Sequence, residues 1–211
     1  MDYSKIKREA REILKGNLWN ILKPMLVLFA IYFVIGFSAG FGSANVAMGD
    51  ASQQSTGMNL VTSILEFLAM PIGFGVLVYE VKLVRKKPYE LKEIFAHYSK
   101  FWPIFCLSFL VGLFTFLWSL LLLIPGIIAA ISYSQAMLLM VDGENDPMEC
   151  IKQSKAMMYG YKWDYFVFHL SFILWYLLGL VTFGLAFIYV GPYVQVAEIL
   201  YYEELRKVHK K

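Results

Sequence analysis

The sequence predicts an all-α membrane protein of six transmembrane helices in three hairpins, each preceded by a cytoplasmic interfacial helix. Three observations carry this prediction. Residues 101–141 contain no charged side chain, and this run is twice as long as the roughly 20 apolar residues that one helical crossing needs. Only 17% of the 211 residues are charged, whereas soluble domains have about 25%. Lys and Arg gather in alternate connecting segments.

Residues 3–15 have the pattern of an amphipathic helix at the membrane interface. The apolar residues recur at helical spacing on one face: Tyr3, Ile6, Ala10 and Ile13. Charged residues occupy the rest of the helix, as in helices that lie on a bilayer surface. Gly16 is placed to end the helix in a left-handed cap. A second interpretation stays open, in which this helix packs on the transmembrane helices.

The whole chain, 1–211, is predicted to form one integral membrane domain. The predicted spans are about 21–41, 60–83, 101–124, 126–141, 165–183 and 185–202. Pro125 and Gly126 are the only adjacent pair of helix breakers in the long apolar run, so they predict the turn of the central hairpin. Gly184 marks the turn of the last hairpin.

Two of the connecting segments, 88–98 and 142–164, are predicted to contain helices, and a third, 42–59, is predicted to be a polar loop of small residues. Residues 88–98 form a short amphipathic piece. In the connector 142–164, Asp146 is placed to cap a helix that begins at Pro147. Glu149 completes the capping pattern, and Gly160 is placed to stop this helix.

The positions of the basic residues predict the orientation of the spans. Six Lys and Arg lie in 1–23, six in 82–100, three in 142–165 and four after residue 205, which accounts for all nineteen. Basic loops stay on the cytoplasmic side, so six spans with both termini inside satisfy this rule throughout. A re-entrant 126–141 segment would place the basic C-terminal tail outside, and we reject it.

The chain also shows an approximate threefold repeat. A tryptophan stands near the start of each odd-numbered span, at Trp19, Trp102 and Trp163, where the membrane interface favours indole. Each even-numbered span carries a proline beside or near a glycine. These residues are candidate hinges: Pro71, Gly73, Pro125, Gly126, Gly191 and Pro192. Such helices can line a cavity, and kinks that serve helix packing are the open alternative.

The last hairpin contains the most specific pair of candidate site residues. His169 is fifteen residues before Gly184 and Glu198 is fourteen after it, so an antiparallel hairpin places them at nearly the same depth. Ionisable groups within spans are candidates for ligand or proton handling. A structural hydrogen bond between the two helices is the competing interpretation.

Other polar residues in the spans are weaker candidates. Glu66 lies near the outer end of its helix and can instead reach the surface. Glu80 is interpreted as an interfacial anchor beside Lys82. The last group of ligand or proton candidates is Ser132, Ser134 and Gln135, which can equally serve helix packing.

Several classes of function have no support in the sequence. We find no nucleophile–base pair, phosphate-binding glycine loop or metal-spaced cluster, so we expect no catalytic residue, no metal and no cofactor. Cys106 and Cys150 lie in a span and a polar loop, which argues against a disulfide. A nucleic-acid-binding protein would need a basic face on a soluble domain, and we expect no nucleic-acid partner.

Several motifs together resemble a known family. They are REILKGNLW, LWSLLLLIPGIIAAISYSQA, SKAMMYGYKW, LSFILW and GPYVQVAEILYYEEL. They resemble an uncharacterised bacterial integral-membrane family, domain of unknown function 975, over nearly the whole chain. The Pro-Gly and Ser-Lys…Gly…Trp segments are also distantly similar to the membrane domain preceding some glycerophosphodiester phosphodiesterases. No catalytic domain follows here, so that activity is not implied.

These observations favour a non-enzymatic component of the bacterial plasma membrane: an accessory, lipid-associated or envelope-homeostasis protein. The expected partners are membrane lipids, with a protein partner or a second copy of the chain also open. The alternative is a small transporter or permease subunit with a polar site between proline-kinked helices.

Overall fold

The computed structural model describes the backbone of residues 1–47 and 54–209 and the side chains of 1–37 and 60–209. All regular structure in these residues is helical, which confirms the all-α prediction. The helices are α1 (Tyr3–Ala47), α2 (Gln54–Val84), the 3₁₀ helix η1 (Leu91–Lys100), α3 (Phe101–Leu121), α4 (Leu123–Tyr133), α5 (Ala136–Val141), α6 (Pro147–Met157), α7 (Lys162–Leu170), α8 (Ile173–Val181) and α9 (Phe187–His209).

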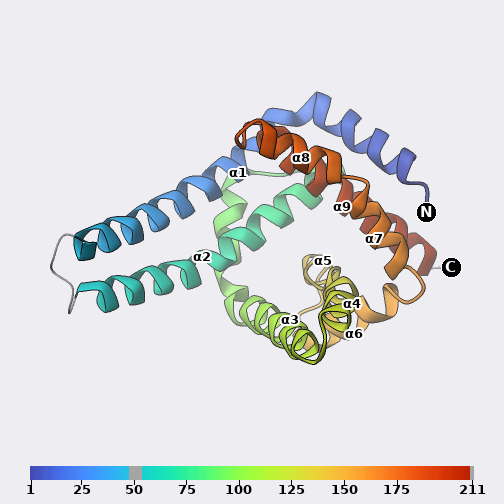
Figure 1. Ribbon diagram of the computed structural model, residues 1–211. Helices are drawn as coiled ribbons and strands as arrows, with labels where there is room; N and C mark the ends of the chain where they lie inside the picture. Colours follow the sequence, from blue (N-terminus) through green and yellow to red (C-terminus); the bar gives the residue numbers. More distant parts are fainter. Residues whose placement is uncertain (48–53, 210–211) are drawn as a thin grey trace.

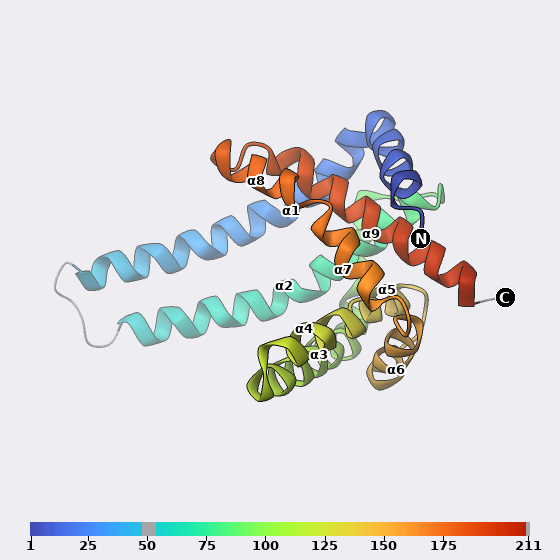
Figure 2. The ribbon, with the colours of Figure 1, turned by 45° about the vertical axis from the view of Figure 1, so that its right-hand side comes forward.

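Helices that follow one another in sequence pack in pairs: α1 with α2, α3 with α4, and α8 with α9. The α1–α2 pair projects as a long arm at the left of Figure 1, and both chain ends lie on the opposite side of the molecule. The turned view in Figure 2 shows the same arrangement. The helical core therefore lies at the base of this arm, where α9 meets α1 and α2.

Five segments of the described chain are long and apolar enough to cross a membrane. They are Tyr3–Phe37, Leu60–Val84, Leu91–Leu121, Leu123–Val141 and Lys162–Val181. The predicted sixth span, 185–202, falls in α9 and does not meet this criterion, because α9 contains five Asp, Glu, Lys or Arg residues. Six crossings therefore remain a prediction.

α9 is the central helix of the fold. Ten of its residues are buried, and it contacts α1, α2, α6 and α8. Protein therefore surrounds much of α9. A helix in this position can carry more polar residues than a helix surrounded by lipid, because its neighbours can satisfy them.

The N-terminal amphipathic segment packs on protein, as in the second interpretation above. Its buried residues are Ile6, Ala10 and Leu14. Arg11 donates to the Tyr193 hydroxyl of α9 across 3.3 Å. The prediction of a left-handed cap at Gly16 is wrong, because the helix continues through a kink at Asn17 with φ −136° and ψ 16°.

The turn of the central hairpin lies earlier than predicted. Leu122, with φ −164° and ψ 150°, separates α3 from α4. Pro125 therefore stands in the first turn of α4, where its missing N–H breaks no helical hydrogen bond. Gly126 lets the two helices approach, because a Cβ at this position would lie 2.8 Å from Ser119 Cα.

The other predicted breaks do not interrupt their helices. Pro71 and Gly73 lie inside a continuous α2, and Gly191 and Pro192 lie inside α9. A proline removes one backbone hydrogen bond, which the surrounding protein can compensate. The close contact on α2 is instead at Gly75, where a Cβ would lie 2.7 Å from Ile94 Cα.

The predicted Asp146 cap and the stops at Gly160 and Gly184 are confirmed, but the capping pattern through Glu149 is wrong, because Asp146 N donates to Glu144 Oε1. The Asp146 side chain accepts from Met148 N at 2.9 Å, and α6 begins at Pro147. Gly160 and Gly184 both have positive φ, 83° and 92°, as expected where the chain leaves a helix and turns.

The predicted 88–98 piece becomes η1, which lies along α2. Ile94 is fully buried, and the Tyr98 hydroxyl donates to Leu68 O at 3.1 Å. η1 runs directly into α3 and belongs to the same apolar segment. It therefore packs on α2 as the first part of the third helical segment.

Candidate functional site

The His169–Glu198 pair predicted from the turn at Gly184 is present. His169 Nε2 of α7 lies 3.0 Å from Glu198 Oε1 of α9. The other ring nitrogen, Nδ1, is buried and has no hydrogen-bond partner among the described residues. Nε2 is thus the nitrogen that contacts the carboxylate, and this close contact joins the two helices.

The interpretation of Glu80 as an interfacial anchor is wrong. Its side chain on α2 is 1% exposed, and neither carboxyl oxygen has a hydrogen-bond partner in the described part of the chain. It interacts electrostatically with Gln195 and Glu198 of α9, although Gln195 stands outside hydrogen-bond geometry. Glu80 therefore belongs to the interior, beside the predicted pair.

Tyr165 connects this pair to the middle of the chain. Its ring lies 4.3 Å from that of His169 and 5.2 Å from that of Tyr201. It also interacts with Ser134 and Gln135, at the junction of α4 and α5. Residues from all three predicted hairpins thus meet here. We call the following set the inner polar cluster: Glu80, Ser134, Gln135, Tyr165, His169, Gln195, Glu198 and Tyr201.

The α4–α5 junction has unsatisfied polar groups of its own. Gln135 is buried, and its Nε2 donates to Ser134 Oγ at 2.8 Å. Its Oε1 has no partner among the described residues, and the same holds for the buried hydroxyl of Tyr201. The inner polar cluster therefore holds several buried polar atoms without hydrogen bonds, which is unusual in a folded protein.

Ser132 has a structural role rather than a place in the cluster. Its hydroxyl donates to Ile128 O at 2.6 Å. Ser154 of α6 donates to Ser132 O at 2.8 Å and accepts from Gln135 N at 3.2 Å. These bonds replace helical ones where α4 ends, so the packing interpretation holds for Ser132.

Glu66 lies apart from the cluster. It is exposed on α2, fourteen residues before Glu80, or about 21 Å along a helix. The structure thus brings together His169, Glu198, Ser134 and Gln135 but not Glu66.

The sequence analysis missed a second group of charged residues, near the C-terminus. Asp142 Oδ1 lies 2.5 Å from Arg85 Nη1, and Asp142 Oδ2 lies 2.9 Å from Arg206 Nη1. The Tyr202 hydroxyl donates to Oδ2 at 2.7 Å, and Arg85 also contacts Glu203. We call Arg85, Asp142, Tyr202, Glu203 and Arg206 the terminal ion cluster. It joins α2 and α9 to the end of α5.

The repeat contains a signal for this second cluster. Arg85 follows Pro71 by fourteen residues, and Arg206 follows Pro192 by fourteen. Arginines at matching positions of the first and third predicted units therefore bind one carboxylate, which follows the second predicted unit. Repeat-based alignment could have paired the arginines, but the position of Asp142 depends on tertiary packing.

The charges of the terminal ion cluster stabilise one another. Burial of Asp142 opposes its ionisation, but hydrogen bonds from Arg85 and Tyr202 and the charges of Arg85 and Arg206 outweigh it. Together they hold the pKa of Asp142 below its usual value. Asp142 is therefore ionised at neutral pH.

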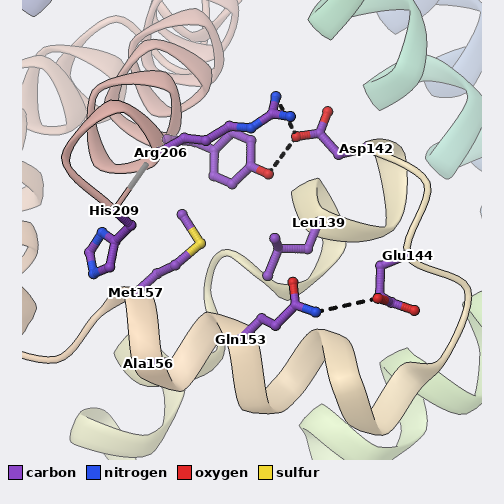
Figure 3. Close-up of a pocket in the computed structure, with 9 residues that line it drawn as sticks. Leu139, Asp142, Glu144, Gln153, Ala156, Met157, Arg206 and His209 are labelled. Atoms are coloured by element: carbon purple, nitrogen blue, oxygen red, sulfur yellow. Dashed lines mark hydrogen bonds and ion pairs between the residues drawn. The ribbon is translucent and has the colours of Figure 1, made fainter. Parts of the chain in front are cut away.

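A pocket of about 440 Å³ opens beside the terminal ion cluster. Figure 3 shows Arg206 directed at Asp142, and Gln153 donating to Glu144 on the other side of the pocket. His209 and Met157 complete the wall nearest the C-terminus. The pocket carries both charge signs, and its charged side chains are largely engaged with one another.

Metal-binding and nucleophilic groups are not clustered in the described chain. No three His, Cys, Asp or Glu residues of that part are grouped as a metal site. Both cysteines are free thiols. Burial, with the nearby acids Glu144 and Asp146, raises the pKa of Cys150 to about 11, which keeps this thiol protonated and unreactive at neutral pH.

Comparison with known proteins identifies the family. The family model described as "Protein of unknown function (DUF975)" matches residues 1–134 and 120–209. The chain belongs to the DUF975 family. The family predicted from the sequence motifs is therefore confirmed, and its apolar helices are compatible with a multi-pass membrane protein.

A search of curated proteins and a search of solved structures found no match to this DUF975 chain. The similarity to the membrane domain of glycerophosphodiester phosphodiesterases stays a prediction. Membership in DUF975 transfers no residue role, so any function must be argued from the inner polar cluster, the terminal ion cluster and the apolar surface.

Proposed function

We propose that this DUF975 protein is a non-enzymatic component of the bacterial plasma membrane, with an accessory, lipid-associated or envelope-homeostasis role. The observation that carries the proposal is the exposed apolar surface. Phe29, Phe33 and Phe37 are exposed along α1, and Leu120 and Ile124 are exposed at the turn of the central hairpin. A surface this apolar is stable in lipid and would aggregate in water.

The topology that fits this surface has six crossings and both termini in the cytoplasm. α9 serves as the sixth crossing, since surrounding helices shield its polar residues from lipid. All Lys and Arg then lie on the cytoplasmic side of the membrane or at the cytoplasmic end of a span. Trp19 and Trp163 are exposed, as anchors at the inner interface would be. Trp102 is also exposed, but it follows Phe101, which packs on Phe67 within the α2 span and away from that interface.

Membrane lipids are the proposed partners. Phe29, Phe33 and Phe37 form a row of stacked rings on α1, next to an apolar pocket of about 380 Å³. Acyl chains of lipids match such a surface in chemistry, because both are apolar. Association with a protein or a second copy through this surface is the alternative.

Mild detergent extraction followed by lipid and protein mass spectrometry tests this role. We expect specific lipids to co-purify at a fixed ratio to the chain. Phe33→Ser should reduce that ratio, whereas Lys92→Ser, at an exposed residue of η1, should not. A chain that purifies free of both lipid and partner would refute the lipid-associated role.

The inner polar cluster favours a second candidate, a small transporter or permease subunit. Buried Glu80 and the His169–Glu198 pair bring ionisable groups from α2, α7 and α9 together. Ionisable residues inside membrane proteins often mark a substrate or ion pathway. Flux measurements in liposomes test it, and flux equal to that of empty liposomes for ions and small solutes would refute it.

A further inference from the structure

Glu80 is the most unusual buried group in the molecule. An isolated carboxylate inside a protein is strongly unfavourable, so buried charges are normally paired with a cation or accept several hydrogen bonds. Glu80 is fully buried, and neither oxygen accepts or donates a hydrogen bond within the described chain. No cation of the described chain compensates a negative charge there.

The two groups that act on Glu80 have opposite effects on its ionisation. Both lie on α9: the amide of Gln195 favours the carboxylate, and the charge of Glu198 opposes it. The nearest cation along α2, Lys82, is engaged by both oxygens of Glu93 of η1 at 2.8 Å. From α1, η1, α3 and α5, which also contact α2, no described cation acts on Glu80.

Glu198 has a different environment from Glu80. It lies 3.0 Å from His169 Nε2 and is about one-third exposed. A negative charge on Glu198 lies next to the His169 imidazole and is partly exposed, whereas a second charge on Glu80 would meet repulsion in a fully buried position. Two neighbouring carboxyls in such unequal surroundings tend to hold one proton between them.

We propose that Glu80 is a buried proton-binding site, a neutral carboxylic acid at neutral pH that shares one negative charge with Glu198. The ligand is a proton, and its release leaves a carboxylate that Gln195 favours and Glu198 repels. His169, beside Glu198, is the third titratable member. This inference goes beyond the proposed function and holds for an accessory protein as well as for a transporter.

Infrared spectroscopy of the purified full-length protein tests the proposal. A neutral carboxylic acid gives a C=O stretch that is separate from carboxylate bands and shifts in D₂O. We expect such a band at neutral pH in the wild type and its loss in Glu80→Gln. The matched control is Glu90→Gln, which replaces an exposed carboxylate paired with Lys92 and should leave the band unchanged.

A band that persists unchanged in Glu80→Gln would overturn the proposal, and so would the absence of the band in the wild type. Stability gives a second readout. Because the folded state holds a proton on Glu80 that the unfolded chain releases near the ordinary carboxyl pKa of about 4.3, the wild type should become less stable as the pH rises above that value. Glu80→Gln should show less of this change. If Glu80→Gln cannot be isolated, a wild type that gains stability as the pH rises above that value would refute the site.

Discussion

His169 lies 3.0 Å from Glu198 although twenty-nine residues separate them in the chain. The two residues stand at nearly equal distances from the turn at Gly184, whose φ of 92° reverses the chain. The contact therefore follows from hairpin geometry alone. It fixes α7 against α9 and places an ionisable pair at the centre of the fold.

The first prediction asks whether this pair serves structure or function. The double variant His169→Gln with Glu198→Gln should accumulate at the wild-type level and lose no more than about 1 kcal/mol of stability, because two amides can still form a hydrogen bond. Expression level and thermal unfolding in detergent measure this. If the variant accumulates normally but fails to complement a deletion strain, the transporter candidate becomes the better one.

The second prediction concerns Asp142 in the terminal ion cluster. Asp142→Asn leaves Arg206 unpaired and Arg85 only partly paired, and breaking a half-buried ion pair in this way should destabilise the protein by about 3 kcal/mol. Unfolding in detergent measures the loss. The control Glu204→Gln removes an exposed pair with Lys207 and should change stability by less than about 1 kcal/mol. Equal effects of the two variants would contradict the account.

The third prediction gives the pH dependence of the same carboxyl. The pKa of Asp142 is lower in the folded state than its ordinary value of 3.8. Its contribution to stability is therefore complete above about pH 4 and is lost as the pH falls through the folded pKa. The stability difference between wild type and Asp142→Asn should stay constant from neutral pH down to that point and then shrink. If this stability difference instead grew as the pH fell, the pKa of Asp142 would not be lowered in the folded state, and the prediction would be wrong.

The fourth prediction separates packing from hinge motion in α2. Gly75→Ala should destabilise the protein by about 1–3 kcal/mol, because the new Cβ meets the backbone of Ile94 in η1. Gly73→Ala is the matched control, since no atom lies within 4 Å of a Cβ there. Thermal unfolding compares the two. Loss of function in a stable Gly73→Ala protein would restore Gly73 as a hinge.

The sequence predicted local features well, because their causes are local. Long apolar runs predicted the helices, Asp146 with Pro147 predicted the start of α6, and counting from Gly184 predicted the His169–Glu198 contact. The turn at Leu122 was missed, since leucine carries no turn signal and the nearby Pro125 and Gly126 do.

The remaining errors arise from contacts between distant segments. Glu80 stands beside Lys82 in the sequence, which suggested a position at the membrane interface. Its burial depends instead on which face of α2 is covered by α9. The terminal ion cluster likewise assembles residues from three separate parts of the chain. Local patterns cannot specify such contacts, because they depend on how the helices pack.

The central claim is that α9 crosses the membrane as the sixth span, and cysteine accessibility tests it most directly. In a background without Cys106 and Cys150, single cysteines replace Phe183, which is 99% exposed, and the exposed Val208 near the C-terminus. A membrane-impermeant maleimide applied to intact cells should label position 183 and should label position 208 only after the membrane is opened. Labelling of both positions from the same side would contradict a transmembrane α9 and leave five crossings.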